Sequence, residues 1–333
     1  MIEYIHSMRK KYLILVLMLA VALLGSFAFA QIRSTDIVLS ISPLNPNPNQ
    51  DVSATISSHS TDLDKANISW LINNQETSKG IGKKSFSFRM GSLGTPTVLS
   101  VSIETLEGQT VSKNITITPA DVDMLWEAYD TYAPPFYKGR ILAPSQGQYK
   151  VVAMPNIINQ NGKVDVTNLS YDWKKDDDNQ IDSSGWGKNY FIFQNSYLDK
   201  NNVVEVAVSD ISGGTNASGK INLQPIDPKI LFYENDPTLG TKWETSLSDG
   251  FSIDSNGKTI VAEPYFFSPK NINSGDLDFG WSLNGNKIDA PNPKNILSVK
   301  PEAGQSGDAT ISLDINNINT LFQEMAKQIT VSF

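Results

Sequence analysis

Polar and apolar residues alternate in short stretches along this chain, and turn-forming residues separate the stretches. Residues 51–56 alternate strictly, residues 97–106 do so over a longer run, and residues 203–210 repeat the pattern. A period of two places successive side chains on opposite faces of a β-strand. Asn, Asp, Gly and Pro residues between the runs favour turns. The pattern therefore predicts an all-β protein built from many short strands.

Three tryptophans, Trp70, Trp173 and Trp281, recur at intervals of 103 and 108 residues, and Asn, Asp or Gly follows each within four positions. A fixed long period is typical of a tandem array. About seven strands in about a hundred residues fit an immunoglobulin-like β-sandwich. Proline-bearing joints lie near residues 119 and 225–228. We predict three such domains with the tryptophans in their cores, and the predicted ranges are 36–118, 119–226 and 227–333.

The N-terminal segment predicts export. Basic residues 9–11 precede an apolar run over residues 12–24, and Ala28-Phe-Ala30 matches the small-x-small pattern that a signal peptidase cleaves. Residues 1–30 are thus a signal peptide, or an uncleaved N-terminal anchor helix, since residues 12–30 approach the ~20 residues that span a bilayer. The chain contains no cysteine, which excludes a lipoprotein anchor and leaves stability to apolar burial.

The charge balance disfavours nucleic acid as a partner. Three of the 27 basic and one of the 35 acidic residues lie in residues 1–30, so the remainder has a formal charge of −10. A nucleic-acid-binding protein needs a basic surface to displace counterions. No polybasic cluster follows the signal segment. Membrane attachment is therefore expected only through the N-terminal segment, if it is not cleaved.

Histidine and cysteine usage disfavours catalysis. His59 is the only histidine after residue 30, and it lies in a serine-rich turn without the glycines of a nucleophile elbow. Pairs of carboxylates can hydrolyse glycosides, but Asp and Glu are scattered along turns. The prediction is no enzyme and no catalytic residue, with a carboxylate-based hydrolase as the third functional hypothesis.

An acidic turn follows Trp173 and is the best candidate metal site. Calcium collects carboxylate and carbonyl oxygens from such turns, and alternating oxygen ligands are available at Asp176, Asp178, Gln180 and Asp182. The glycine and the bidentate Glu of a calcium loop of the EF-hand type are absent. A solvated turn without metal is the alternative interpretation, and no other cofactor is predicted.

Two aromatic-rich segments, residues 124–139 and 231–244, precede the second strands of the second and third predicted domains. Their side chains can stack on sugar rings or anchor a protein partner. The alternative is that they fill the joint between domains. The candidate contact residues are Trp126, Tyr129, Tyr132, Phe136, Tyr137 and Trp243. Residues 319–327 predict a couple of helical turns.

A tryptophan strand followed by an Asn/Asp/Gly turn, repeated in an acidic exported chain, resembles the immunoglobulin-like and PKD-like domains of bacterial surface proteins. The paired aromatic segments look like those of uncharacterised surface proteins from small-genome, candidate-phylum bacteria. A PKD domain would show a Trp-x-Phe-Gly-Asp-Gly-like turn, whereas Trp70-Leu-Ile-Asn-Asn departs from it. The broader immunoglobulin-like label is therefore retained, and it implies no particular activity.

Together these features predict an exported, non-catalytic surface protein that serves adhesion or cell-envelope architecture as a semi-rigid rod. Its partners would be other envelope proteins or surface glycans. The second hypothesis is an extracellular glycan-binding protein that uses the aromatic segments of the second and third domains.

Overall fold

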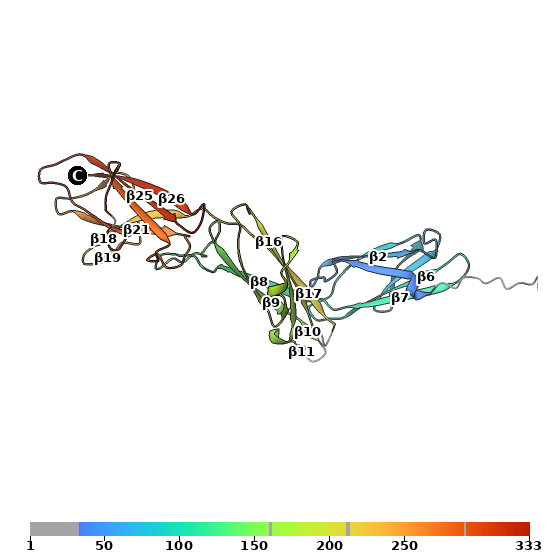
Figure 1. Ribbon diagram of the computed structural model, residues 1–333. Coiled ribbons are helices and arrows are strands. Elements are labelled where there is room, and N and C mark those ends of the chain that lie inside the picture. Colours follow the sequence, from blue (N-terminus) through green and yellow to red (C-terminus); the bar gives the residue numbers. More distant parts are fainter. Residues whose placement is uncertain (1–32, 160–161, 211–213, 290) are drawn as a thin grey trace, which may run out of the picture. The chain divides into compact units, whose positions relative to one another are not determined.

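A computed structural model describes residues 33–333 except 160–161, 211–213 and 290 (Figure 1). The predicted signal or anchor helix of residues 1–30 lies outside the described residues. Over the described ranges, regular structure consists of β-strands and three short 3-10 turns, so the all-β prediction is confirmed. None of the described helical turns is long and apolar enough to cross a membrane. The turns are η1 (Ser34–Asp36), η2 (Val166–Asn168) and η3 (Ile181–Ser183).

The first sandwich consists of a three-stranded sheet, β1-β2-β5, and a four-stranded sheet, β4-β3-β6-β7. Trp70 and Leu99 are fully buried, because alternate residues of β3 and β6 point into its core. The strands are β1 (Ile37–Ser42), β2 (Asp51–Ser58), β3 (Asn67–Ile72), β4 (Gln75–Ile81), β5 (Ser85–Arg89), β6 (Thr97–Glu104) and β7 (Thr110–Ile117).

The second sandwich repeats this order, with sheets β15-β9-β8 and β13-β12-β16-β17, where the short β14 also pairs with β12. Trp173, Tyr149 and Tyr171 lie in its core. The strands are β8 (Asp121–Ala128), β9 (Gln148–Asn156), β12 (Ser170–Lys175), β13 (Asp178–Asn179), β14 (Gly185–Trp186), β15 (Tyr190–Gln194), β16 (Asn202–Ser209) and β17 (Asn216–Leu223). A separate hairpin pairs β10 (Ile158–Asn159) with β11 (Gly162–Lys163).

The third sandwich has sheets β19-β18-β21-β24 and β20-β26-β25-β22-β23. Trp281, Phe232 and Phe267 are buried in its core. The strands are β18 (Lys229–Asp236), β19 (Gly240–Thr241), β20 (Phe251–Ser252), β21 (Lys258–Tyr265), β22 (Leu277–Leu283), β23 (Asn286–Lys287), β24 (Ile296–Val299), β25 (Asp308–Asn317) and β26 (Glu324–Ser332). Three tandem immunoglobulin-like sandwiches are thus present.

The chain forms two compact units. The first comprises residues up to Ile41, Ser53–Phe88 and Val98–Thr116, and the second comprises Ser42–Val52, Arg89–Thr97 and Ile117–Phe333. The second unit contains the complete second and third sandwiches. Their cores span residues 120–223 and 230–331. The domain limits at 118/119 and 226/227 stay predictions.

The three core tryptophans make the same hydrogen bond. Each indole N–H donates to the backbone carbonyl of a lysine two residues before β5, β15 or β24. The donor–acceptor pairs are Trp70–Lys83 at 2.9 Å, Trp173–Lys188 at 2.9 Å and Trp281–Lys294 at 2.8 Å. A buried indole N–H needs such a partner. Each tryptophan therefore joins the two sheets of its sandwich, and its burial confirms the core position that the repeat predicts.

The turn after each tryptophan strand is also repeated. Its first residue has φ near 50° at Asn73, Asp176 and Asn284, and its second also has positive φ, as a type I′ hairpin turn requires. The backbone N–H of the first residue donates to a carbonyl at the start of β6, β16 or β25, and its side-chain Oδ1 accepts the N–H of that same residue. The residues held in this way are Val98, Val203 and Thr310.

One sequence prediction, the helical turns of residues 319–327, is wrong. Residues 324–327 are not helical, because they pair with β25 through contacts such as Glu324 with Asn316, and residues 318–322 form a turn and a bend. The first halves of the two aromatic-rich segments form strands β8 and β18, which occupy the place of β1 in the first sandwich.

Candidate functional site at the junction of the second and third sandwiches

The β8–β9 loop, residues 129–147, leaves the second sandwich and pairs with the backbone of the third. The N–H of Tyr132 donates to the carbonyl of Phe267 at 2.7 Å, and the N–H of Phe266 donates to the carbonyl of Tyr132 at 3.0 Å. The Asp130 carboxylate accepts the N–H of Lys270 at 3.0 Å. These bonds fix the loop on the third sandwich, much as a short strand is fixed to a sheet.

The side chain of Tyr132 contacts a buried carboxyl group. Its hydroxyl donates to Oε2 of Glu263 at 2.7 Å, and Glu263 is only 4% exposed. Burial raises the pKa of the Glu263 carboxyl above its ordinary value, although the hydrogen bond from Tyr132 opposes the rise. Burial, and then the bond to Glu263, raise the pKa of the Tyr132 hydroxyl. Burial of a carboxyl group costs free energy unless the group is hydrogen-bonded, and the Tyr132 hydroxyl supplies that hydrogen bond to Glu263.

Aromatic rings from the two sandwiches pack together around this contact. The ring of Tyr137 meets Tyr265 at 5.8 Å and Phe266 at 5.7 Å, both edge to face. The hydroxyls of Tyr265 and Tyr233 lie 2.8 Å apart. Edge-to-face pairs at these separations add stabilisation beyond area burial. The cluster therefore fastens the β8–β9 loop to β18 and β21.

One edge of the cluster faces solvent. Phe136 is 80% exposed, and its ring lies 6.2 Å from Trp243, which in turn packs 5.4 Å from Tyr233. The φ of Phe136 is 63°, a left-handed conformation that is rare for a bulky residue. Phe136 and Trp243 are the part of the cluster that an external ligand can reach.

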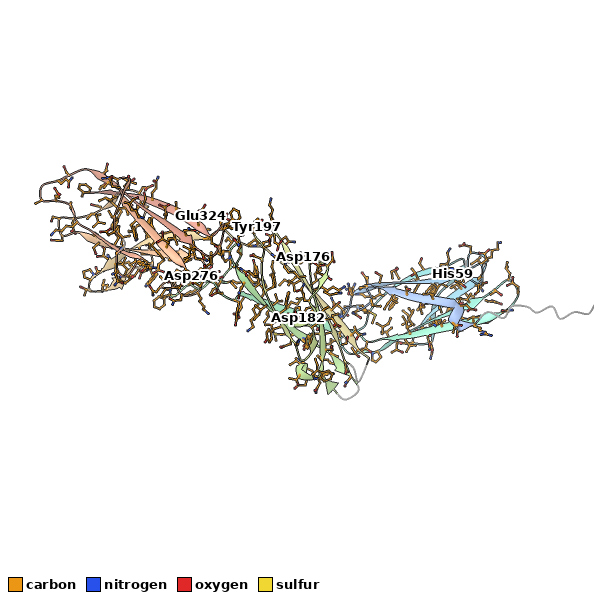
Figure 2. All side chains as sticks on the ribbon, in the orientation of Figure 1. His59, Asp176, Asp182, Tyr197, Asp276 and Glu324 are labelled. Atoms are coloured by element: carbon orange, nitrogen blue, oxygen red, sulfur yellow. The ribbon has the colours of Figure 1, made fainter. Side chains whose placement is uncertain are left out.

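A second, polar contact lies beside the aromatic one. Gln323 is fully buried: its amide nitrogen donates to the carbonyl of Ser145 at 2.8 Å, and its amide oxygen accepts the N–H of Ser268 at 3.0 Å. The rings of Phe322 and Tyr197 meet at 5.3 Å, and Figure 2 shows Tyr197 near Glu324 at the start of β26. The third sandwich thus holds the second at two places.

The structure brings together four of the six predicted contact aromatics. Tyr132, Phe136, Tyr137 and Trp243 gather at the junction through the contacts given above. The other two lie elsewhere on the second sandwich. Trp126 packs against Tyr149 in the core with the Arg140 guanidinium 4.8 Å above its ring, and Tyr129 is 46% exposed beside Lys150.

Sequence reasoning missed Glu263, Tyr265 and Phe266. Glu263 and Tyr265 lie in β21 and Phe266 follows it, and the run Glu-Pro-Tyr-Phe-Phe at residues 263–267 was the available signal. A contact between Tyr132 and Glu263 spans 131 residues, so no local pattern could have predicted it.

The acidic turn after Trp173 is held by its own chain. Both carboxylate oxygens of Asp176 are engaged, one by the N–H of Val203 at 2.8 Å and the other by Lys175. Burial raises the pKa of the Asp176 carboxyl, but these bonds and the Lys175 charge outweigh it and hold that pKa below its ordinary value.

The other predicted calcium ligands do not join Asp176. Asp178 and Asp182 are exposed, the Gln180 side chain donates to the Asp178 carbonyl, and Figure 2 shows Asp182 well apart from Asp176. Among the described residues, no group of three or more His, Cys, Asp or Glu side chains could hold a metal ion. The calcium site stays a prediction.

His59 lies exposed in the turn after β2 (Figure 2). Its serine neighbours bond to each other, with Ser58 Oγ 3.2 Å from Ser60 Oγ. That arrangement supplies no buried base and no nucleophile oriented toward the imidazole. The absence of enzymatic activity stays a prediction.

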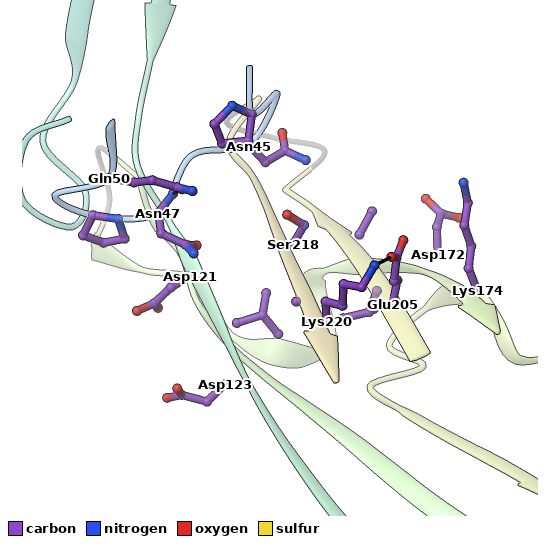
Figure 3. Close-up of a pocket in the computed structure, with 16 residues that line it drawn as sticks. Asn45, Asn47, Gln50, Asp121, Asp123, Asp172, Lys174, Glu205, Ser218 and Lys220 are labelled. Carbon is purple, nitrogen blue, oxygen red and sulfur yellow. Dashed lines mark hydrogen bonds and ion pairs between the residues drawn. The ribbon is translucent and has the colours of Figure 1, made fainter. Parts of the chain in front are cut away.

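A cavity of about 770 Å³ is lined by residues that all belong to the second compact unit (Figure 3). Its walls include Asp121 and Asp123 at the start of β8, and an ion pair of Lys220 with Glu205 at 2.6 Å. The amide side chains of Asn45, Asn47 and Gln50 also line it. No aromatic residue is among its lining residues, so this cavity is distinct from the predicted aromatic contacts.

No protein-family model and no curated protein matches this chain. Solved structures do. The fibronectin(III)-like modules of Clostridium thermocellum CbhA share 11% identity at a TM-score of 0.27, covering 56% of this chain and 94% of that one. The central fibronectin-III array of RIM-binding protein shares 9% identity at a TM-score of 0.30, covering 90% and 98%.

A third similar structure is SGBP-B from the Bacteroides ovatus mixed-linkage glucan utilization locus, in complex with a mixed-linkage heptasaccharide. It shares 11% identity at a TM-score of 0.20, covering 89% of this chain and 70% of that one. At 9–11% identity, a similarity to a solved structure concerns the fold alone. The immunoglobulin-like sandwiches of this chain are evident from its own sheet order.

Proposed function

We propose that the chain is an exported, non-catalytic protein of adhesion or cell-envelope architecture whose second and third sandwiches act as one stiff piece. The observation that carries the proposal is the two-way backbone pairing of Tyr132 with Phe266 and Phe267, closed over Glu263. Neighbouring domains move relative to each other by default unless their interface is large and apolar. This junction supports a spatial role, in which the chain holds its binding surfaces at a fixed separation.

The junction is suited to that role because the backbone groups that join the two sandwiches belong to buried residues. Phe266 and Phe267 are at most 6% exposed, and the backbone of Tyr132 donates its N–H to the Phe267 carbonyl and accepts the N–H of Phe266. Breaking the pairing would leave buried backbone groups without partners, which costs about 1–3 kcal/mol for each group. A hinge motion between the two sandwiches would have to break several of these bonds at once.

The test is the distance distribution between the two sandwiches in the chain lacking residues 1–30, measured by energy transfer between one label on each sandwich. We expect a narrow distribution in the unchanged protein and a broad one after Tyr132→Ala combined with Gln323→Ala. The matched control is Tyr129→Ala, which removes an exposed ring outside the junction. A broad distribution in the unchanged protein would overturn the proposal.

A second candidate function is glycan binding, favoured by the exposed Phe136 ring beside Trp243. Sugar rings can stack on such faces. Phe136→Ala and Trp243→Ala should then weaken retention of the protein on polysaccharide columns, while Tyr129→Ala should not. Equal retention of all three variants and the unchanged protein would remove this candidate.

A further inference from the structure

The second and third sandwiches carry the same sheet in the same register. Val122 of β8 pairs with Pro155 of β9, and Ile230 of β18 pairs with Pro264 of β21. From this alignment, Leu125 of the second sandwich corresponds to Tyr233 of the third. In the same way Met154 corresponds to Glu263 and Tyr190 to Ile296. The side chains of these three corresponding pairs lie on the outer face of the sheet, which points away from the core of its own sandwich.

The outer face of the third sandwich is covered. Tyr233, Val261 and Glu263 are 5%, 3% and 4% exposed, because the aromatic cluster lies over them. The same face of the first sandwich is more polar: Ser53 and Thr55 of β2 are exposed there, together with the apolar Val38 of β1. The outer face of the third sandwich is thus buried under the aromatic cluster, whereas that of the first sandwich is exposed to solvent.

The outer face of the second sandwich is apolar but bare. Leu125, Met154 and Tyr190 are 54%, 50% and 52% exposed, and Val152 connects them because it pairs with Leu125 on one side and with Tyr190 on the other. A contiguous exposed apolar patch on a soluble protein marks an interaction surface. Protein interfaces are enriched in aromatic residues and Met relative to the rest of the surface, and Tyr190 and Met154 are residues of these two types.

The charges around this patch are of both signs and lie close together. Lys150 lies between the rings of Tyr129 and Tyr190, at 5.8 and 5.7 Å from their centroids. Its ammonium group is 3.9 Å from Glu127, a loose ion pair with both partners accessible to water. Asp123 flanks Met154 in the next row. A face that carries both signs beside an apolar centre is complementary to itself.

We infer that the outer face of the β15-β9-β8 sheet binds the same face of a second copy of the chain. In a two-fold pair, each residue that touches a second residue is touched by it in return. The apolar rows formed by Leu125, Val152 and Tyr190 would then stack on each other, and Lys150 of each copy would meet Glu127 of the other. This surface is separate from the junction, so the inference does not rest on the proposed function.

The first experiment is sedimentation equilibrium of the chain lacking residues 1–30, between about 1 µM and about 1 mM. We expect a monomer–dimer equilibrium, and Leu125→Glu or Tyr190→Glu should raise its dissociation constant by about tenfold or more. The matched control is Leu106→Glu, which replaces a 72% exposed leucine in a turn of the first sandwich. A monomer at every concentration, or a dimer that both patch variants leave unchanged, overturns the inference.

A charge exchange tests the two-fold geometry. Glu127→Lys alone and Lys150→Glu alone should each weaken the dimer, and the double variant should restore it. Thermal unfolding of the diluted monomer should change little in the double variant, because Glu127 is exposed, Lys150 is partly exposed and the loose ion pair between them is kept with its charges exchanged. The absence of cysteine allows a further check. Met154→Cys should yield a covalent dimer with a short thiol-specific crosslinker, and Leu106→Cys should not. Failure of both outcomes, or occupation of this face by a different protein while the chain stays monomeric, contradicts the inference.

Discussion

The second and third sandwiches share strand order, register, the tryptophan hydrogen bond and the type I′ turn, yet their outer faces differ. On the third, Glu263 and Val261 are buried under a loop from the second sandwich, whereas Met154 and Val152 at the same positions lack such a cover. The comparison shows that strand pairing and core packing determine the sandwich fold, whereas a few outward-facing residues determine which surface packs against it. The junction depends on an added loop and not on a different fold.

The largest effect should come from the feature that the two sandwiches share. Trp173→Ala and Trp281→Ala should each cost about 3–5 kcal/mol of unfolding free energy, because a large cavity forms and the indole hydrogen bond is lost. Circular dichroism during urea titration measures this. Trp186→Ala is the matched control, since Trp186 is 57% exposed on the second sandwich and should change stability by no more than about 0.5 kcal/mol. A loss similar to that of the control at either core position would contradict the shared-core interpretation.

The next largest effect should appear only at the covered face. Tyr132→Phe removes the hydroxyl that donates to Glu263 and leaves a buried carboxyl without that donor. We expect a loss of about 1–3 kcal/mol from the unfolding transition that includes the third sandwich. Tyr129→Phe makes the same chemical change on the bare face and should have no measurable effect, because the Tyr129 ring is 46% exposed. Equal losses from the two substitutions would remove the distinction between the faces.

Much of each sandwich could be predicted from the sequence. Alternation in β2, β6 and β16 and the interval between Trp70, Trp173 and Trp281 depend on local pattern and on core packing, which a sequence displays directly. β4 (Gln75–Ile81) could not be predicted in this way. It is a polar edge strand without buried residues, and it exists because its backbone pairs with β3.

The destination of the aromatic residues could not be predicted either. Tyr132 and Trp126 are six residues apart in one aromatic segment, yet one reaches the third sandwich and the other packs against the core of the second. Position on the strand decides this: Trp126 is an inward residue of β8, and Tyr132 follows the end of that strand. The helix predicted for residues 319–327 failed for a related reason, since pairing with β25 overrides local helix preference.

A smaller effect should appear as a pH dependence confined to the covered face. Burial raises the pKa of the Glu263 carboxyl above its ordinary 4.5, so the folded chain holds a proton there that the unfolded chain has already released. The corresponding stability is fully present below about pH 4.5 and is lost as pH rises through the folded-state pKa. Relative to Glu263→Gln, the unchanged protein should therefore lose stability as pH rises through this window. The effect is smaller than that of Tyr132→Phe because ionised Glu263 keeps its hydrogen bond.

The control for that titration comes from the bare face. Met154 occupies the position of Glu263 in the second sandwich and does not titrate, so Met154→Gln should shift the unfolding free energy by the same amount at every pH. Unfolding free energies from urea titrations at half-unit pH steps measure both differences. A pH-independent difference between the unchanged protein and Glu263→Gln would show that Glu263 ionises alike in the folded and unfolded states.

The smallest effect should distinguish a structural turn from a calcium site. Asp176 performs the hydrogen bonding that Asn73 and Asn284 perform in the other sandwiches, and asparagine tolerates the same left-handed conformation. Asp176→Asn should therefore change stability by no more than about 0.5 kcal/mol, and Asp176→Ala should cost about 1 kcal/mol more because it leaves the N–H of Val203 without its acceptor. Thermal unfolding with calcium and with a chelator completes the test. If calcium raises the midpoint of the unchanged protein and Asp176→Asn abolishes this rise, the turn binds calcium. If calcium and the chelator give the same midpoint in the unchanged protein and the same midpoint in Asp176→Asn, the carboxylate serves the turn alone.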